Sequence, residues 1–252
     1  RGIVIKQCKG VEIDNISITG FPHAALIMWG PDADAFIHHS YIGENVRSGL
    51  GYGVKPIDGA YVEVAYCKFY KNRHSIDSTG GSYYIHDSHF DSEHPLGVGV
   101  IFQHQHEMSG IIVIQDNTFV NCTRAIHMTT GHGVISGNTI KATVWSIALR
   151  RLWDGKDYKG YLHDLEVFDN EVLGGRYNIL DIKAEDNVFL DGVKVELKGD
   201  GNYSPITWSN QAKKALKVKW PAVITAGITA LSFSGYLIYM KIKGISNVDK
   251  EH

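Results

Sequence analysis

Apolar and polar residues alternate in short runs along most of the chain, and one eight-residue pattern recurs. The pattern has apolar residues at its first, third and eighth positions and Asn or a small residue at its sixth. It is clearest in Val62–Phe69, Ile112–Phe119 and Leu165–Val172. Alternation with a period of two predicts strands that bury one face. The Gly, Asn and Asp residues between these runs predict turns.

The spacing of the pattern predicts the architecture. Its sixth position falls at residues 16, 40, 67, 88, 117, 138, 170 and 187, so one repeat takes about 24 residues. A unit of this length with strands alone is too short for a propeller blade and lacks the helix of a leucine-rich repeat. We therefore expect an all-β fold, a right-handed parallel β-helix of about eight coils. Equal offsets from the sixth position should then lie above one another.

The sixth position itself has a structural interpretation. Asparagine occupies it in four repeats and a small residue in three others: Asn117, Asn138, Asn170, Asn187, Ser40, Cys67 and Ser88. Stacked Asn side chains can bond to one another and to the turn backbone. We expect a structural ladder here, with a converging amide site as the alternative, and an ordinary buried thiol at Cys67.

These repeats and the segment Asn72–Gly80 resemble the pectin-lyase-like β-helix superfamily over about residues 3–195. The resemblance is closest to NosD-like periplasmic β-helices and archaeal cell-surface β-helix proteins, and Asn72–Gly80 looks like a loop of the archaeal group. It implies the fold but no single activity, because the superfamily includes lyases, hydrolases, epimerases and binding proteins.

The C-terminal part of the chain predicts a membrane anchor. Residues 221–240 carry no charge and as a helix would span roughly 30 Å, the thickness of a bilayer core. Trp220, Tyr236 and Tyr239 lie near its ends, as expected for interfacial residues. We therefore divide the chain into a β-helix at 1–195, a cap and linker at 196–219, a transmembrane helix at 220–241 and a polar tail at 242–252.

Two signals disagree on the orientation of this anchor. More lysines precede the hydrophobic segment than follow it, and the positive-inside rule alone would place the β-helix in the cytoplasm. Three glycosylation sequons, at Asn15, Asn121 and Asn202, favour the outside, as does the family resemblance. We predict a single-pass protein of the cell membrane with its β-helix on the extracellular or periplasmic side.

Composition excludes few functions. The net charge is -2, so bulk charge does not support nucleic-acid binding. The three cysteines form neither a disulfide framework nor a zinc motif, and no cofactor is implied.

Basic residues or His recur six or seven residues after the sixth position, and one repeat has a tryptophan there. With His127 from the neighbouring positions, the predicted ligand-binding residues are Arg47, Arg73, His74, His94, Arg124, His127, Trp145 and Arg176. Arginine binds carboxylate or sulfate in a two-pronged way, and an indole can stack on a sugar ring. The hypothesis is an acidic polysaccharide along a basic stripe. The alternative is a set of ordinary polar turns.

A catalytic function remains open. Arg73, His74 and Asp77 could supply the cation and base that a uronate lyase or epimerase needs. A glycoside hydrolase needs a pair of carboxylates that no motif here provides. The polygalacturonase motif Gly-His-Gly occurs at 131–133, but its partner motifs do not.

A metal-handling role is the third alternative. His104 and His106 alternate on a predicted strand, and with Glu107 they could bind zinc or copper. We favour a membrane-anchored β-helix that binds glycans or partner proteins without catalysis. The partner proteins would include other subunits of a membrane complex.

Overall fold

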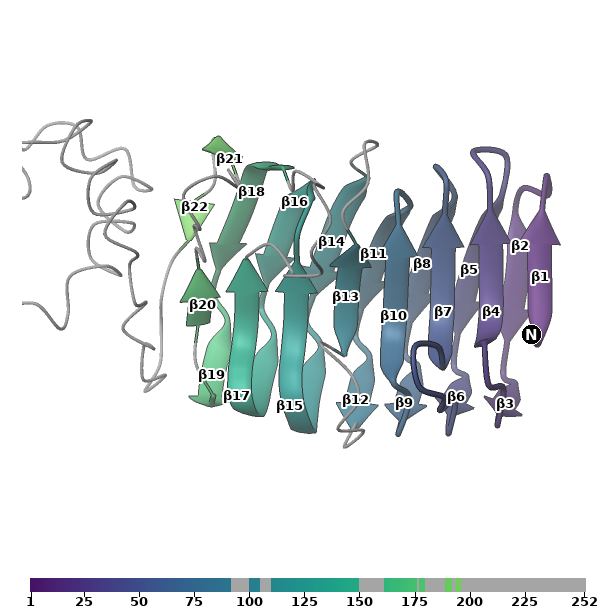
Figure 1. Ribbon diagram of the computed structural model, residues 1–252, viewed down its shortest axis with the longest axis horizontal. Helices are drawn as coiled ribbons and strands as arrows, with labels where there is room; N and C mark the ends of the chain where they lie inside the picture. The colour runs from purple at the N-terminus through teal and green to yellow at the C-terminus, as the bar shows by residue number, and fades with distance from the viewer. Residues whose placement is uncertain are drawn as a thin grey trace, which may run out of the picture.

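The computed structural model describes residues 1–91, 100–104, 110–149, 161–175, 177–179, 189–191 and 194–195. Within these ranges the chain winds into an all-β parallel solenoid of about six turns (Figure 1). Every pairing between its strands is parallel, and most turns contribute three strands. The predicted parallel β-helix is confirmed.

The strands stack into three columns that run along the rod. The first stack contains β1 (Ile3–Lys6), β4 (Ala24–Trp29), β7 (Tyr52–Ile57), β10 (His74–Thr79), β13 (Ile101–His104) and β20 (Tyr177–Ile179). The second stack contains β2 (Val11–Asp14), β5 (Asp34–His38), β8 (Tyr61–Ala65), β11 (Ser82–His86), β14 (Ile111–Gln115), β16 (Gly131–Ser136), β18 (Tyr161–Phe168), β21 (Phe189–Asp191) and β22 (Lys194–Val195). The third stack contains β3 (Ser17–Thr19), β6 (Tyr41–Gly43), β9 (Lys68–Tyr70), β12 (His89–Asp91) and β19 (Glu171–Gly174).

Two long strands join the first and third stacks. These are β15 (Thr118–Met128) and β17 (Thr139–Leu149). The start of β15 pairs with β12 and its end pairs with β13, so the strand passes through the bend between the stacks. The pairing register of β15 and β17 shifts once before and once after Cys122, where the two strands bend together.

The apolar positions of the sequence pattern fill the interior of the rod. In the third stack, Phe69, Phe90 and Phe119 are fully buried, and their rings stack with centroids 4.7 Å apart. In the second stack, equivalent positions carry Ile37, Val64 and other buried aliphatic residues in register. Stacked aromatic pairs add about 0.5–1.5 kcal/mol to the stabilisation from buried area. The two-residue alternation therefore marks the core correctly.

The sixth positions form the predicted ladder. The backbone N–H of Asn117 donates to Oδ1 of Asn138 at 3.0 Å, and that of Asn138 donates to Oδ1 of Asn170 at 3.1 Å. The Asn138 side-chain amide also donates to the Ile114 carbonyl. All of these groups are buried, so each bond satisfies a backbone or amide group that water cannot reach.

A left-handed backbone conformation precedes the ladder in each of the described turns. The residue before the sixth position has positive φ in seven successive repeats: Asn15, His39, Tyr66, Asp87, Asp116, Gly137 and Asp169. Asn and Asp tolerate this conformation better than most residues, and Gly adopts it freely. This one residue per turn produces the sharp corner after each strand of the second stack.

A second ladder was not predicted from the sequence. The Phe21 N–H donates to Oδ1 of Asn45 at 2.8 Å, and the Asn45 amide donates to Oδ1 of Asn72 at 2.8 Å. Each Asn lies five residues after a sixth position, at 40 and 67. This equal offset of the two Asn residues is the sequence signal from which the second ladder could have been predicted.

The described residues form about six turns of the roughly eight coils that the sequence predicts, and the later repeats fall partly outside these residues. One prediction about the fold needs correction. Asn72–Gly80 is not a loop, since His74–Thr79 is the buried strand β10.

The C-terminal predictions lie outside the described residues. These are the cap and linker at 196–219, the transmembrane helix at 220–241 and the polar tail at 242–252. In the part of the chain that the structure describes, no helix has the length and hydrophobicity to span a bilayer.

The Asn ladder predicts a large effect of a small substitution. Asn138→Ala should destabilise the fold by about 3 kcal/mol, because it removes five hydrogen bonds and leaves the buried backbone N–H of Asn117 without its acceptor. Denaturant unfolding measures this loss. Lys141→Ala, an exposed neighbour in β17, should change stability by less than about 0.5 kcal/mol. Equal effects of the two variants would contradict the ladder.

The cysteines should differ in reactivity. Burial raises the pKa of Cys67 to about 11 and that of Cys122 to about 12, so both remain protonated thiols at neutral pH. Cys8 is exposed. We expect a thiol reagent at pH 8 to label only Cys8 in the native protein and all three cysteines after unfolding. Rapid native labelling of Cys67 would show that the core is open.

Candidate binding face on the first stack

A row of ring side chains crosses the outer face of the first stack, which faces the viewer in Figure 1. Neighbouring rings in the row have centroids 5.1–6.3 Å apart, and the row is Tyr52, His74, Phe102, His127 and Trp145. Tyr52 pairs with His74 and Phe102 pairs with His127 in the register of the sheet. The other two steps of the row pass from one register column to another, because Phe102 pairs with Asp77 and Trp145 pairs with Arg124.

Tyr52 is the centre of a cluster at one end of this row. Its ring lies 5.9 Å from that of His74, and Lys55 Nζ lies 4.2 Å from the Tyr52 ring centroid. Its hydroxyl donates to the Gly49 carbonyl at 2.9 Å. Burial and the Asp77 charge raise the pKa of Tyr52, while the neighbouring Arg73 opposes that rise. The hydroxyl is therefore a hydrogen-bond donor at neutral pH.

Asp77 forms a buried ion pair in this cluster. Its carboxylate is fully buried and contacts the ammonium of Lys55, which is itself mostly buried. Both residues project from the outer face, Asp77 from β10 and Lys55 from β7. The Lys55 ammonium neutralises the Asp77 carboxylate. A carboxylate that acts as a catalytic base would instead have to be accessible to its substrate.

Two arginines lie over aromatic rings of the row. Arg73 Cζ is 5.9 Å from the Tyr52 ring centroid, and Arg124 Cζ is 4.6 Å from that of Trp145. Arg124 and Trp145 are register partners in β15 and β17, as their equal offsets predicted. Arg73, Arg124 and Trp145 are all partly exposed, whereas His74 and His127 are fully buried.

Arg47 does not belong to this row. It lies in the exposed loop between β6 and β7, where it bridges to Leu50. The extra residues of this loop displace Arg47 from the column, and Tyr52 takes the position that the offset had assigned to it. Arg47 instead contributes to the positive field that, after burial and Arg1, lowers the pKa of His23.

The structure thus brings most of the described candidates onto one face. Arg73, His74 and Asp77 lie together around Tyr52, while Arg124, His127 and Trp145 lie further along the same row. Four predicted site residues lie outside the described residues: His94, His106, Glu107 and Arg176. For His104 only the backbone is described, so the predicted His104/His106/Glu107 metal site stays a prediction.

Sequence reasoning missed three members of this face. Tyr52, Lys55 and Phe102 share no common offset from the sixth position, because insertions in their turns change the number of residues between the sixth position and the strand. Parallel pairing restores their alignment in space.

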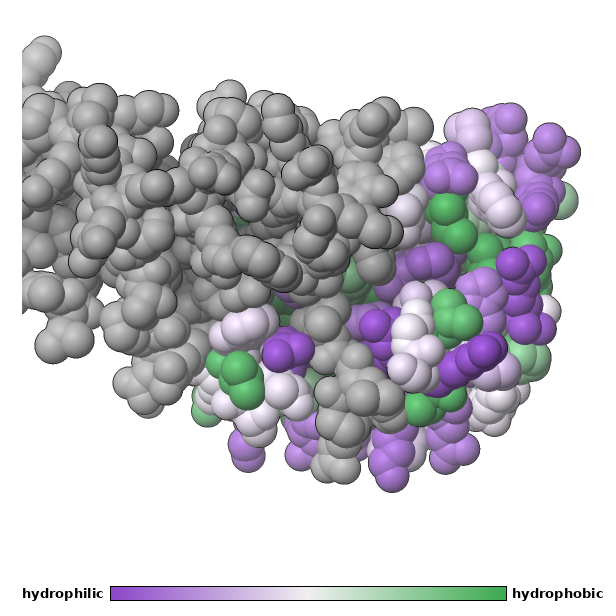
Figure 2. Space-filling model, viewed as in Figure 1, coloured by the Kyte–Doolittle hydropathy of each residue, from purple (hydrophilic) through white to green (hydrophobic). Residues whose placement is uncertain are grey.

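The surface at the N-terminal end of the rod is mixed in character. In Figure 2, hydrophilic and hydrophobic residues are interspersed there in small patches, which is typical of a solvated surface.

Comparison with known families agrees with this architecture. The family described as the right handed beta helix region matches residues 1–151, and the chain belongs to that family. This agrees with the resemblance to the pectin-lyase-like superfamily. Neither a curated protein nor a solved structure gives a significant match.

The Lys55–Asp77 pair can be tested by a double-mutant cycle. Lys55→Met should cost about 3–5 kcal/mol, because it leaves the Asp77 carboxylate buried without its cation. The double variant Lys55→Met/Asp77→Leu should be more stable than Lys55→Met alone. Urea unfolding of the four proteins gives the coupling energy. A coupling energy near zero would show that the pair does not exist in solution.

Proposed function

We propose that this chain is a membrane-anchored extracellular β-helix that acts as a non-catalytic binding or accessory subunit. An acidic glycan would lie along the outer face of the first stack. The observation that supports this is the row of rings flanked by two partly exposed arginines, Arg73 and Arg124, each over an aromatic ring.

The spacing of these groups suits a polymer with repeated carboxylates. Arg73 precedes β10 and Arg124 lies in β15, with β13 between them, so two strand spacings of about 4.8 Å separate them along the rod. Guanidinium groups bind carboxylates in a two-pronged way. Trp145 lies one strand further and offers a partly exposed indole for stacking on a sugar ring.

The state of Asp77 and His74 favours binding over catalysis. Both side chains are fully buried, and Asp77 is neutralised by Lys55. A base that removes a proton from a uronate must reach the sugar within hydrogen-bond distance. The alternative, a uronate lyase or epimerase, is supported by the clustering of Arg73, His74 and Asp77, because such clusters are common in active sites.

The location of the protein rests on the hydrophobic segment 221–240, with the β-helix outside the cell. Two of the three glycosylation sequons fall on described residues, and both Asn15 and Asn121 are exposed. Exposure is a requirement for modification and supports this orientation. A long, flat side of a solenoid also suits docking of another subunit of a membrane complex.

Binding can be measured with the full chain in detergent. We expect oligogalacturonate to bind, with an affinity that falls as ionic strength rises. Arg73→Ala and Arg124→Ala should each weaken binding about tenfold, which corresponds to about 1.4 kcal/mol. Lys141→Ala removes an exposed cation of β17 from the third-stack part of the strand and should leave binding unchanged. Equal losses in all three variants would indicate unspecific attraction.

The same samples separate binding from catalysis. A lyase would generate an unsaturated uronate with ultraviolet absorbance, and an epimerase would exchange substrate protons with deuterated solvent. We expect neither signal. Turnover that disappears in Asp77→Asn would contradict the non-catalytic proposal.

A further inference from the structure

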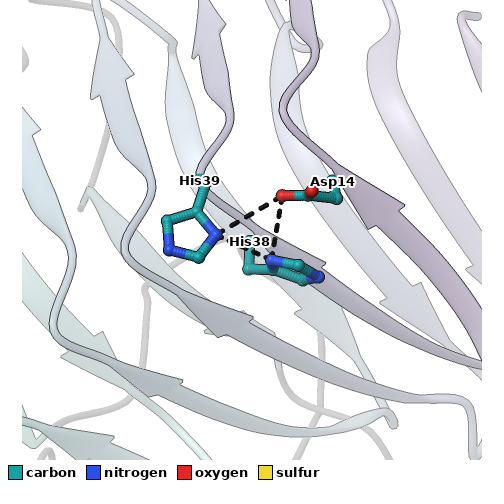
Figure 3. Close-up of side chains that lie close together, drawn as sticks. All are labelled: Asp14, His38 and His39. Atoms are coloured by element: carbon teal, nitrogen blue, oxygen red, sulfur yellow. Dashed lines mark hydrogen bonds and ion pairs between the residues drawn. The ribbon is translucent and has the colours of Figure 1, made fainter.

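Three potential metal ligands converge at the corner after the second stack, on a part of the rod separate from the row of rings. They are Asp14 at the end of β2, His38 at the end of β5 and His39 in the bend that follows (Figure 3). Among the described residues, this is the one group of three or more His, Cys, Asp or Glu side chains that converges in this way.

The fold explains how these three side chains meet. Asp14 and His38 are register partners in adjacent coils and therefore lie one above the other. Successive side chains of a strand normally point to opposite faces. His39 has φ of 47° at the bend, and this left-handed conformation brings its ring to the same side as that of His38. The rings of two adjacent histidines therefore lie on one side of the chain and point to the same place.

The distances among the three atoms fit a small cation. Nδ1 of His38 lies 2.8 Å from Nδ1 of His39 and 3.0 Å from Oδ1 of Asp14, and His39 Nδ1 lies 3.3 Å from the same oxygen. A triangle with these sides has a circumradius of about 1.8 Å, so a point about 1 Å above it is about 2.0–2.1 Å from all three atoms, the usual Zn–N and Zn–O distance.

A fourth residue orients the ring of His38. Glu12 Oε1 lies 2.9 Å from Nε2 of His38, and a carboxylate accepts hydrogen bonds only, so Nε2 carries the proton. Nδ1 of the same ring faces the Asp14 carboxylate at 3.0 Å, so either a second ring proton or a shared cation lies between these two atoms. Carboxylate–histidine–metal arrangements are a common feature of metal sites.

Aromatic contacts hold both imidazoles in place. Phe36 stacks on His38 with centroids 4.2 Å apart, and Tyr66 stacks on His39 at 5.3 Å. The His38 side chain is 11% exposed, and that of His39 is 61% exposed. The ligands are therefore oriented, while the open side of the triangle faces solvent.

We propose that Asp14, His38 and His39 form a binding site for a zinc-like divalent transition-metal ion, with Glu12 as the residue that orients His38. Imidazole and carboxylate donors suit Zn²⁺ and Cu²⁺. Three protein ligands leave a fourth tetrahedral position, which is characteristic of exchangeable sites rather than closed structural ones. The ion would link the first two coils of the rod and offer a coordination position to a ligand or a partner.

The chain provides a matched control two coils further along. His86 occupies the same corner, and its two ring nitrogens lie 2.8 Å from Asp87 and 3.3 Å from Glu63. It has carboxylates on both sides but no second histidine at this point. His86→Gln should therefore leave the proposed site intact.

The test uses the full chain in detergent, stripped of metal with a chelator and titrated with Zn²⁺ in a calorimeter. His39→Ala and Asp14→Asn should each remove one equivalent of Zn²⁺ relative to the parent protein. Glu12→Gln should weaken that equivalent about 10–100-fold. Affinity should fall as pH falls, because protons compete for the imidazoles. His86→Gln should bind like the parent protein.

Electron paramagnetic resonance of the Cu²⁺ form identifies the donors. The parent protein should show coupling to two imidazole nitrogens, and His39→Ala to one. Because Asp14 and His39 are exposed, these variants should fold normally, which circular dichroism verifies. Unchanged Zn²⁺ stoichiometry in both His39→Ala and Asp14→Asn, or an equal loss in His86→Gln, would overturn the proposal.

Discussion

Hydrogen bonding from each coil to the next is the interaction on which this molecule depends. Among the described residues, every strand pairs in parallel with strands of neighbouring coils, so none of these coils satisfies its backbone alone. The corners would break this continuity, because the backbone turns sharply there and remains buried. Side-chain oxygens close the gap: Asn138 and Asn170 accept from the backbone of the preceding coil, and Asn45 and Asn72 do the same at a second corner. The ladders therefore supply acceptors to buried backbone N–H groups at these tight bends.

The same register that stacks the core also stacks the outer faces. On the first stack it aligns Tyr52 with His74 and Arg124 with Trp145. On the second stack it places Asp14 beside His38. Outer columns have no packing requirement to keep them apolar, so polar, aromatic and charged residues can accumulate there. The solenoid thereby offers two separate surfaces, one with guanidinium groups and rings and one with imidazoles and carboxylates.

Burial divides the residues of the first face by role. His74, Asp77 and His127 are fully buried and hold the face together, through ring contacts and through the ion pair with Lys55. Arg73, Arg124 and Trp145 remain partly exposed, so they are the groups that a ligand can reach. This division is the physical basis for proposing recognition rather than proton abstraction at this face.

The sequence by itself determined the fold class, the buried positions and the Asn ladder, because alternation with a period of two and a repeat of about 24 residues leave few other architectures. It also placed Arg124 and Trp145 in one column. The tertiary structure decided the rest. Asn72–Gly80 became a strand, Arg47 left the column because its loop contains extra residues, and Lys55 proved to neutralise Asp77. Asp14 and His38 have the same offset, two residues before a sixth position, and the structure pairs them, but only the left-handed turn at His39 brought a third ligand to the same point. Sequence spacing predicts which side chains of neighbouring coils meet only where the coils have equal length. Insertions, and the left-handed residue at each corner, decide the other side-chain contacts.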